Sequence, residues 1–416
     1  MYKVENHLKD KNGILYIEDV NVLGLAEKYD TPLYVYSESR IKENYNNLFN
    51  TFKKYYNKFK LYYSIKANNN LEILKILKEM GSCADCSSPG EIYLAKKAGI
   101  NDIIYSGIYY RNDELEYGIK NNAIINLDDI KKLKFLKNNN IDTICFRVNP
   151  GIGNGKFNQI VTGGKEAKFG IIEEEILECY KEALRLGFKK FGIHMMTGSC
   201  ILDKDYFEKI TKILMDIAGN IANKLNIKFE FINIGGGFGI TYENNENNLN
   251  LDKTAYNVVK IFKEKINEYN LGNPYLFIEP GRYVIADSCI LLTKVCSIKK
   301  KPKYFIGVDC GMNTLIRPML YDAYHEILLA NDLNLQKEDK VDIVGQICES
   351  TDIFAKNRMM PKIKEDYILA ILNCGAYGFS MSSRYGGKPL CGEVLVSKDK
   401  YRLIRKRESL EDLESK

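Results

Sequence analysis

Eight short apolar runs, most of them separated by helix-like patterns, constrain the fold of this chain more than any other feature of its sequence. The runs lie at 62–66, 83–87, 103–107, 123–127, 144–149, 191–196, 231–236 and 275–281. Strand patterns that alternate with helix patterns predict parallel strands joined by crossover helices. Because a (β/α)8 barrel contains eight such units, we expect this α/β architecture, with reactive groups at the carboxyl ends of its strands.

The pattern changes on both sides of the predicted barrel. The first 35 residues contain extended segments, LYIEDV and LYVYS, and precede any helical pattern. From about Arg282, β-type runs such as ILLTKVCSI and KYFIGVD take over. We therefore expect three parts: an N-terminal segment (1–35) that packs with the C-terminal domain, a barrel (36–282) and a C-terminal β domain (283–416).

Composition narrows the class of protein. The 416 residues are 45% hydrophobic and 27% charged, which is typical of a soluble globular chain. The net charge of +6 is spread over 60 basic and 54 acidic residues, without a basic block that would predict a nucleic-acid or membrane surface. No stretch approaches the length of a membrane span. We therefore expect a cytoplasmic protein that binds neither nucleic acid nor membranes.

The cysteines are expected to be reduced thiols. There are eleven, an odd number scattered along the chain, and no signal peptide precedes them. Cys83 and Cys86 form a CxxC, but no second pair lies nearby and the chain has three histidines. We therefore interpret this spacing as chance and expect no metal site.

Lys66 follows the first barrel run, in LYYSIKAN (61–68). The carboxyl end of a parallel strand is where β/α folds keep their chemistry. A lysine there can form a Schiff base if its amine is kept unprotonated. Taken alone, the strand more readily predicts a solvated lysine at the start of a loop.

Two further candidates follow later barrel strands. Glycines in GGGFG (235–239) allow backbone N–H groups to approach a phosphate closely, although a tight turn between strand and helix explains them equally well. Glu279, in IEPGR, can hold a proton on a ring nitrogen or can pair with Arg282. For Glu279 taken alone, the ion pair is the safer interpretation.

The C-terminal region adds two more candidates. Cys348 and Glu349, in ICESTD, can supply a thiol acid beside a carboxylate, or can be a buried strand cysteine next to a surface glutamate. Arg317 and Tyr321, in LIRPMLY, can converge on a carboxylate, or can be a solvated arginine and a packed tyrosine. Together, a Schiff-base lysine, a phosphate cradle, a ring-nitrogen acid and a carboxylate clamp are what pyridoxal phosphate requires.

Longer motifs around these residues keep one order over about 31–396. They are YSIKAN at Lys66, DxxSxGE at Asp85, Ser88, Gly90 and Glu91, RVNP at Arg147, KFGI at Lys168, GGGFG at Gly235, EPGR at Glu279, DCGMNTLIRPMLYDAYHEI from Asp309, CESTD at Cys348 and GAYGFSMSS at Tyr377. In these motifs the chain resembles the fold III pyridoxal-phosphate decarboxylases, and is most similar to the diaminopimelate decarboxylase family. The resemblance implies an alanine racemase-like fold, a (β/α)8 TIM-like barrel plus a C-terminal β-sandwich or β-barrel domain, with pyridoxal 5'-phosphate as cofactor.

The resemblance also implies roles for individual residues. Lys66 would hold the cofactor as a Schiff base, Cys348 would protonate the carbanion left after CO2 departs, and Glu279 would partner the pyridine nitrogen. The implied cofactor contacts are Lys66, Asp85, Arg147, Met196, Ser199, Gly236, Gly237, Glu279 and Tyr377. The implied substrate contacts are Arg282, Arg317, Tyr321, Glu349, Ser350 and Tyr377. By the family pattern Cys348, Glu349 and Ser350 reach into the partner subunit's site, which implies a homodimer with shared active sites.

Three segments depart from the family pattern. HxHIGS reads HMMTGS at 194–199, so Met196 replaces the histidine that stacks on the cofactor ring, and its thioether can pack there without a titratable group. His194 lies one layer deeper on the same strand face and is not expected to substitute for that histidine. The segment 151–164 is too rich in Gly and Asn for a helix or strand, so we interpret it as a mobile loop over the barrel mouth. The segment 383–394, SRYGGKPLCGEV, also differs from the common form.

The resemblance implies decarboxylation of meso-2,6-diaminopimelate at its D-centre to L-lysine and CO2, a reaction of lysine biosynthesis. Arg317 and Tyr321 favour such a substrate, which has a carboxylate at each end. One alternative is a decarboxylase of D-lysine or D-ornithine, which Met196 and the changed loop favour. A second alternative is a non-catalytic protein that only carries pyridoxal phosphate. Binding the cofactor needs neither the β domain nor the CES motif, so the presence of both argues against this alternative.

Overall fold

The computed structural model describes residues 7–139, 141, 143–156, 162–164, 166–243, 245–300 and 302–414. The chain forms two compact units. The barrel unit consists of Tyr45–Thr241 and Asn247–Tyr283. The β unit consists of Met1–Asn44, Tyr242–Glu246 and Val284–Lys416.

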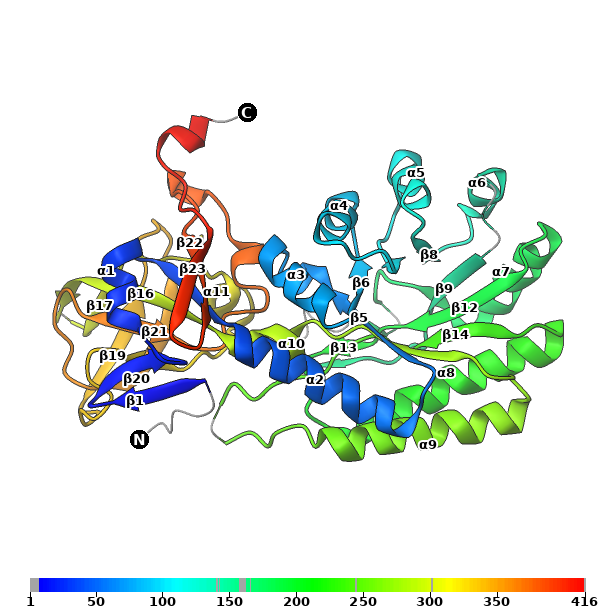
Figure 1. Cartoon of the computed structure of the whole chain (residues 1–416), viewed down its shortest axis with the longest axis horizontal. Helices are drawn as coiled ribbons and strands as arrows, with labels where there is room; N and C mark the ends of the chain where they lie inside the picture. The colour runs from blue at the N-terminus through cyan, green and yellow to red at the C-terminus, as the bar shows by residue number, and fades with distance from the viewer. Residues whose placement is uncertain are drawn as a thin grey trace. The chain divides into compact units, whose positions relative to one another are not determined.

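Eight parallel strands form the centre of the barrel unit (Figure 1). In chain order they are β5 (Phe59–Ser64), β6 (Cys83–Cys86), β7 (Ile103–Tyr105), β8 (Ile124–Leu127), β9 (Thr143–Asn149), β12 (Lys190–Met195), β14 (Phe229–Asn233) and β15 (Tyr275–Ile278). Each strand pairs with its successor, and β15 pairs with β5, so the ring is closed. Every predicted run overlaps one of these strands, and the predicted (β/α)8 barrel is confirmed.

Helices follow the barrel strands, as the crossover pattern predicts. They are α3 (Leu71–Glu79), α4 (Pro89–Ala98), α5 (Asn112–Lys120), α6 (Leu133–Asn138), α7 (Glu173–Arg185), α8 (Lys204–Leu225), α9 (Leu251–Tyr269) and α10 (Arg282–Ile285), while α2 (Glu38–Tyr55) precedes β5. Local sequence sets the bounds of α4: the Ser88 side chain accepts from the Glu91 amide, Pro89 opens the helix, and Gly99 ends it in the left-handed conformation.

Inward-facing side chains from six strands fill the barrel. Tyr62, Cys83, Ile104, Cys145, Phe231 and Phe277 form one buried cluster. The rings of Phe231 and Phe277 stack with their centroids 4.6 Å apart. The interior is therefore a packed core rather than a pore, and it leaves the strand ends to carry chemistry.

The β unit contains a sheet that the first and last parts of the chain build together. Its strands are β4 (Leu33–Ser37), β16 (Cys289–Lys299), β17 (Phe305–Val308), β18 (Ile327–Leu329), β19 (Asp339–Val344), β20 (Ile353–Met360), β21 (Ile368–Ile371), β22 (Gly392–Ser397) and β23 (Lys400–Arg405). They are ordered β20-β19-β17-β16-β4-β22-β23, and β21 pairs with both β16 and β18. The predicted β-rich C-terminal region is confirmed.

One N-terminal helix corrects the sequence analysis, which expected only extended segments there. Three short strands, β1 (Leu8–Lys11), β2 (Ile14–Ile17) and β3 (Val20–Asn21), lead directly into α1 (Val22–Tyr29). Asn21 caps α1 by accepting from the Leu23 amide, and the buried side chains of the helix are Val22, Leu25 and Ala26. This helical spacing spans only two turns, which is why it is easily overlooked.

The segment 151–164 also departs from its prediction. Part of it forms β10 (Asn154–Gly155), which pairs in parallel with β13 (Gly198–Ser199). The sequence analysis predicted neither a helix nor a strand in this segment, which is wrong at 154–155. The strand there results from backbone pairing and not from a side-chain pattern. Residues 157–161 of the predicted loop lie outside the described residues.

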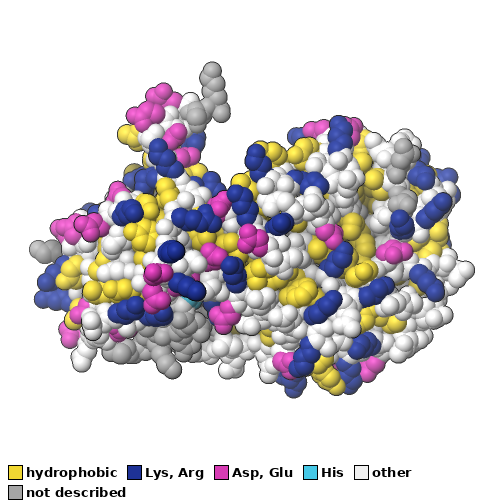
Figure 2. All heavy atoms as spheres, in the orientation of Figure 1, with side chains coloured by type: hydrophobic (Ala, Val, Ile, Leu, Met, Phe, Trp, Pro, Cys, Tyr) yellow, Lys and Arg dark blue, Asp and Glu magenta, His cyan; other side chains and the backbone are white. Residues whose placement is uncertain are grey.

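The surface carries charges of both signs (Figure 2), and the cysteines are unpaired. Lys and Arg side chains are interspersed with Asp and Glu on the face seen in Figure 2. All eleven cysteines are free thiols, including Cys83 and Cys86 at the two ends of β6. Within the described ranges, we find no helix with the length and apolar character needed to cross a membrane.

Candidate active site

Lys66 lies just beyond the carboxyl end of β5, in a single 3-10 turn, η1 (Ile65–Ala67). Its side chain is 44% exposed, and its Nζ lies 3.3 Å from Oδ2 of Asp85 at the end of β6. Ser64 Oγ donates to the same oxygen at 2.8 Å. Burial, together with the charge of Glu279, raises the pKa of Asp85. An amine and a carboxyl group that binds protons readily therefore share one end of the barrel.

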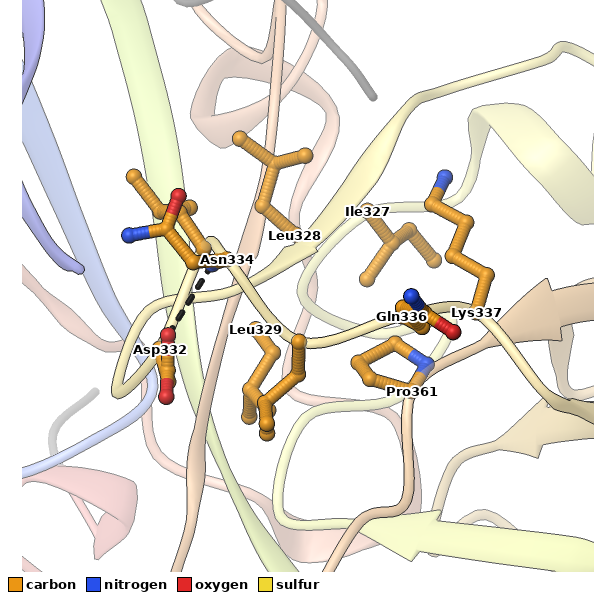
Figure 3. Close-up of a pocket in the computed structure, with 10 residues that line it drawn as sticks. Ile327, Leu328, Leu329, Asp332, Asn334, Gln336, Lys337 and Pro361 are labelled. Carbon is orange, nitrogen blue, oxygen red and sulfur yellow. Dashed lines mark hydrogen bonds between the residues drawn. The ribbon is translucent and has the colours of Figure 1, made fainter.

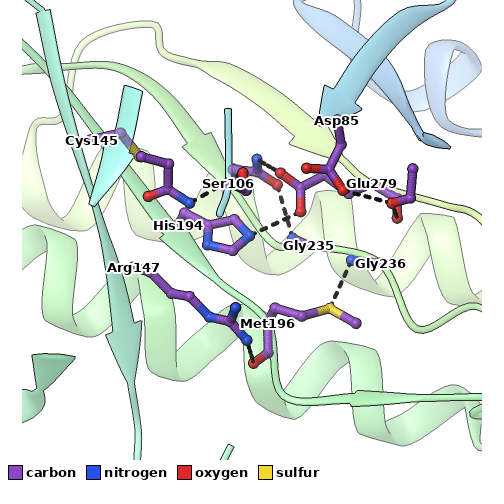
Figure 4. Close-up of polar contacts among 12 residues, drawn as sticks. Asp85, Ser106, Cys145, Arg147, His194, Met196, Gly235, Gly236 and Glu279 are labelled. Carbon is purple, nitrogen blue, oxygen red and sulfur yellow. Dashed lines mark hydrogen bonds and ion pairs between the residues drawn. The ribbon is translucent and has the colours of Figure 1, made fainter. Parts of the chain in front are cut away.

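Glu279 follows β15 and is held by donors from two other strands (Figure 4). Its Oε2 lies 3.0 Å from His194 Nε2, and its Oε1 accepts from Asn233 Nδ2 at 2.7 Å. Burial by itself would raise the pKa of Glu279, but the charge and hydrogen bond of His194, the charge of Lys66 and the Asn233 hydrogen bond together lower this pKa to about 2. Glu279 is therefore a fixed, ionised carboxylate, and its partner is His194 rather than the Arg282 of the simpler interpretation.

Met196 takes part in the same network through its sulfur and its carbonyl (Figure 4). The Gly236 N–H donates to Met196 Sδ at 3.3 Å, and Arg147 Nη2 donates to the Met196 carbonyl oxygen at 3.2 Å. The Arg147 guanidinium also lies over the Phe169 ring, 4.6 Å from its centroid. These contacts link β9, β12 and the glycine turn after β14.

The turn at 235–237 is a cradle that side chains would fill. A Cβ at Gly236 would lie 2.1 Å from the Glu279 carbonyl oxygen, and Gly237 has φ +96°. Next to this turn, Arg282 Nη2 donates to Ser199 Oγ at 3.3 Å. Backbone N–H groups, a hydroxyl and a guanidinium are suitable ligands for a phosphate.

These barrel residues fit the three polar ends of pyridoxal phosphate. The cradle with Ser199 and Arg282 suits the phosphate, Lys66 suits the aldehyde, and the ionised Glu279 suits a protonated ring nitrogen. A series of contacts, in which Ser64 bridges Asp85 and Glu279, connects the predicted set within the barrel unit: Lys66, Asp85, Glu279, Gly236, Met196 and Arg147. Sequence reasoning missed His194 and Asn233 as partners of Glu279, although the period-two pattern already placed His194 and Met196 on one strand face.

Arg317 is the most deeply buried of the predicted site residues in the β unit. It opens α11 (Arg317–Tyr321), is 1% exposed, and places Nη1 2.9 Å from His325 Nε2. Its guanidinium lies 4.9 Å from the centroid of the Tyr242 ring. Among the described residues, no carboxylate lies within ion-pair distance of Arg317, so this buried cation is suited to an anionic ligand. The alternative of a solvated arginine is wrong.

The other β-unit candidates are partly or fully exposed. Cys348, Glu349 and Ser350 are exposed after β19, so the alternative of a buried strand cysteine is wrong. Glu349 accepts a hydrogen bond from Tyr385, and this bond raises the pKa of the Tyr385 phenol. Tyr321 and Tyr377 are half-buried, and Tyr377 has φ 56°.

A pocket of about 410 Å³ in the β unit is a weaker candidate (Figure 3). It lies beside β18, and its lining includes Ile327, Leu328, Leu329 and Pro361. Asp332, which also lines the pocket, accepts a hydrogen bond at Oδ1 from the Asn334 backbone N–H at 2.9 Å. The pocket brings together none of the predicted site residues, so the barrel and Arg317 remain the candidates.

Comparisons with known proteins agree with this geometry. Residues 42–286 match the family described as pyridoxal-dependent decarboxylase, pyridoxal binding domain. The diaminopimelate decarboxylase of Methanothermobacter thermautotrophicus is 44% identical, over 96% of this chain and 95% of that protein. The diaminopimelate decarboxylase of Archaeoglobus fulgidus is 37% identical, over 97% and 96%.

Solved structures give the same result. The diaminopimelate decarboxylase of Methanocaldococcus jannaschii in co-complex with L-lysine superposes with a TM-score of 0.91 at 33% identity, covering 99% of this chain and 97% of that chain. The Helicobacter pylori enzyme complexed with L-lysine superposes with a TM-score of 0.87 at 35% identity, covering 94% and 98%. The predicted cofactor, pyridoxal 5'-phosphate, is thereby confirmed, and the chain belongs to the diaminopimelate decarboxylase family of pyridoxal-dependent decarboxylases.

Proposed function

We propose that this protein removes the D-centre carboxylate of meso-2,6-diaminopimelate as CO2 and leaves L-lysine. The observation that carries the proposal is the buried Arg317 guanidinium, which has no carboxylate partner among the described residues. A substrate with a second, distal carboxylate supplies that partner. The relatives at 44% and 37% identity are diaminopimelate decarboxylases, which supports the same substrate.

The barrel residues hold the cofactor and manage its protons. When bound, pyridoxal phosphate supplies an electron sink for the electron pair left by the departing CO2. Glu279, kept ionised beside His194, stabilises a proton on the ring nitrogen. Asp85 Oδ2, 3.3 Å from Lys66 Nζ, is placed to exchange a proton with the lysine amine.

The remaining cofactor contacts fix its position. Gly236, Gly237 and Ser199 hold the phosphate, and Tyr377 keeps its predicted role as a cofactor contact. Met196 and Arg147, joined by a 3.2 Å hydrogen bond, lie on the neighbouring strand ends and pack beside the ring.

We propose that the distal end of the substrate binds Arg317 and the other predicted substrate contacts. Arg317 engages the carboxylate, and Tyr321, Glu349, Ser350, Tyr377 and Arg282 complete this contact set. D-Lysine and D-ornithine have no distal carboxylate. With either of them bound, the Arg317 guanidinium stays buried without an anionic partner, which weakens their binding.

We propose a homodimer in which each site is completed by the other subunit. Cys348 is exposed, as a residue that must reach another subunit has to be. In this arrangement its thiol returns the proton to the substrate carbon after CO2 has left. The functional parts are the segment 1–35, the barrel 36–282 and the β domain 283–416, and the proposed compartment is the cytoplasm.

The test is CO2 release by the purified, cofactor-loaded protein from meso-diaminopimelate, D-lysine, D-ornithine and L-ornithine, measured side by side. The proposal expects release from diaminopimelate with a kcat/KM at least about 100-fold above the others, as for loss of a buried charged partner. Preference for D-lysine or D-ornithine would instead assign the changed loop and Met196 to a different substrate. Cofactor binding without CO2 release from any of the four would identify a carrier.

A further inference from the structure

The contacts of His325 fix its protonation state. His325 Nε2 lies 2.9 Å from Arg317 Nη1, and its Nδ1 lies 2.7 Å from the Leu372 carbonyl oxygen. A guanidinium only donates hydrogen bonds and a carbonyl only accepts them. His325 therefore carries its hydrogen on Nδ1 and accepts from Arg317 at Nε2, so the imidazole is neutral.

Packing on several sides prevents this imidazole from turning. His325 is fully buried, and its ring meets the Tyr242 ring edge-on, with centroids 5.5 Å apart and planes at 82°. Tyr242 also lies under the Arg317 guanidinium. Arg358 Nη1 donates to the His325 carbonyl oxygen at 3.0 Å. The Nε2 lone pair is thus held toward one nitrogen of Arg317.

The charges around His325 leave the charge of Arg317 uncompensated. Glu326, the next residue in the chain, is buried and lies 3.1 Å from Lys337 Nζ and 3.6 Å from Arg358 Nη1. It also accepts a hydrogen bond from Tyr324. These partners of Glu326 do not include Arg317. A carboxylate at 325 would orient the guanidinium equally well but would neutralise it.

We propose that His325 is a positioning residue that sets the carboxylate selectivity of this enzyme. As a neutral acceptor it orients the Arg317 guanidinium and leaves the positive charge for the distal carboxylate of the substrate. The inference rests on the proposed function, which assigns that carboxylate to Arg317. For this role, the side chain at position 325 must accept a hydrogen bond from Arg317 and must itself be uncharged.

The experiment compares two ligands that differ only in the carboxylate. L-Lysine retains the distal carboxylate, whereas 1,5-diaminopentane has the same amines without it. Both are titrated into the cofactor-loaded protein by calorimetry. His325→Leu is expected to weaken L-lysine binding by about 10- to 100-fold, as for loss of a hydrogen bond to a charged group, while 1,5-diaminopentane binding changes less than about twofold.

Two polar substitutions separate the acceptor from its charge. His325→Gln keeps an amide N–H for Leu372 and an oxygen for Arg317, so the preference for L-lysine should stay within about fivefold of wild type. His325→Glu supplies an acceptor with a negative charge, so the preference should be lost. If His325→Leu does not fold, the Gln and Glu variants still test the proposal. An equal preference for L-lysine over 1,5-diaminopentane in these two variants overturns it.

A double-mutant cycle distinguishes positioning from general damage. If His325 acts through Arg317, His325→Leu should cost no further L-lysine affinity in an Arg317→Ala background, whereas additive losses overturn the proposal. His7→Leu is the matched control, because His7 is also buried in the β unit and neither of its ring nitrogens has a partner among the described residues. It should leave both affinities unchanged.

The outcomes also separate this inference from the proposed function. A wild-type protein that does not prefer L-lysine over 1,5-diaminopentane would overturn the carboxylate contact of Arg317 itself. A wild-type protein with that preference, retained undiminished in His325→Leu, would overturn only the role of His325.

Discussion

His194 and Glu279 form a buried hydrogen-bonded pair at the end of the barrel, with Nε2 of the imidazole 3.0 Å from Oε2 of the carboxylate. They belong to β12 and to the end of β15, with β14 and its Asn233 between them. The pair keeps a carboxylate ionised where burial alone would favour its neutral form. A neutral acid at 279 could not stabilise a proton on the cofactor ring, so His194 matters for catalysis through Glu279.

His194→Leu should move the acid limb of the pH–rate profile to higher pH. In the wild type the pKa of Glu279 is about 2, below its ordinary value of 4.5. The stability that its ionisation contributes is complete above pH 4.5 and is lost as the pH falls toward 2. Without His194, burial raises this pKa, so kcat should fall at a higher pH than in the wild type. An unchanged profile with full cofactor content would contradict the role of His194.

Asp85→Asn should stabilise the cofactor-free protein at neutral pH. Because the pKa of Asp85 is raised above its ordinary value of 3.8, the folded state loses stability as the pH rises from 3.8 to the folded pKa, and this penalty persists above it. Removing the carboxyl group should raise the melting temperature at pH 7 by about 2 °C or more, with reduced activity. The exposed Asp113→Asn, at 67% side-chain exposure, is the control and should show no gain.

Gly236→Ala should abolish cofactor retention. Its Cβ would lie 2.1 Å from the Glu279 carbonyl oxygen, so the turn has to move, at a cost of about 1 to 3 kcal/mol in stability. Absorbance of the bound cofactor after gel filtration measures retention. Gly24→Ala, in α1 and with open space around its Cβ, is the matched control and should retain full cofactor. Equal retention in both variants would show that the cradle is not the phosphate site.

Arg317→Ala should reduce kcat/KM for meso-diaminopimelate by the equivalent of about 2 to 5 kcal/mol, because it removes one partner of a buried charge pair. Any residual turnover of D-lysine should barely change, since D-lysine has no distal carboxylate. Arg111→Ala, at a residue with 71% side-chain exposure, tests for a general effect of removing an arginine. A parallel loss on both substrates would contradict the assignment of Arg317.

Two inactive variants should restore activity when mixed if the sites are shared between subunits. In hybrids of Lys66→Ala and Cys348→Ala, one site carries both substitutions and the other carries neither. Random reassortment of a symmetric dimer therefore predicts recovery of about one quarter of wild-type activity. No recovery, with hybrids shown by mass spectrometry, would mean that each site is built from a single chain. Cys296→Ala, at the other exposed thiol, should be active by itself.

The sequence predicted the barrel because its signal is local. Each of the eight runs combines strand-like residues with flanking turns, and this pattern needs no knowledge of distant contacts. The helix Val22–Tyr29 was missed because two helical turns give a weak period. The strand Asn154–Gly155 was missed because backbone pairing with Gly198 and Ser199 makes it, independently of side-chain pattern.

Site residues on motifs were predictable, whereas the residues that orient them were not. Lys66 and Glu279 were named from the strands that precede them. The contact of His194 with Glu279 depends on the register of strands two places apart in the ring, which residue order does not specify. His325 lies within the motif around Arg317, but only the Leu372 carbonyl on its other side reveals which nitrogen accepts.

The position of β4 dictates an order of events during synthesis. This strand ends at Ser37, yet its two sheet neighbours begin at Cys289 and Gly392. All eight barrel strands have been synthesised once the chain reaches Ile278, well before Gly392, so the barrel ring can close while β4 still lacks β22. The β sheet is completed only after the last hundred residues are made, so a strand whose five residues are all buried in the folded protein stays unpaired for most of translation. Slowed or truncated synthesis should therefore yield chains with a closed barrel and an aggregation-prone N-terminal edge.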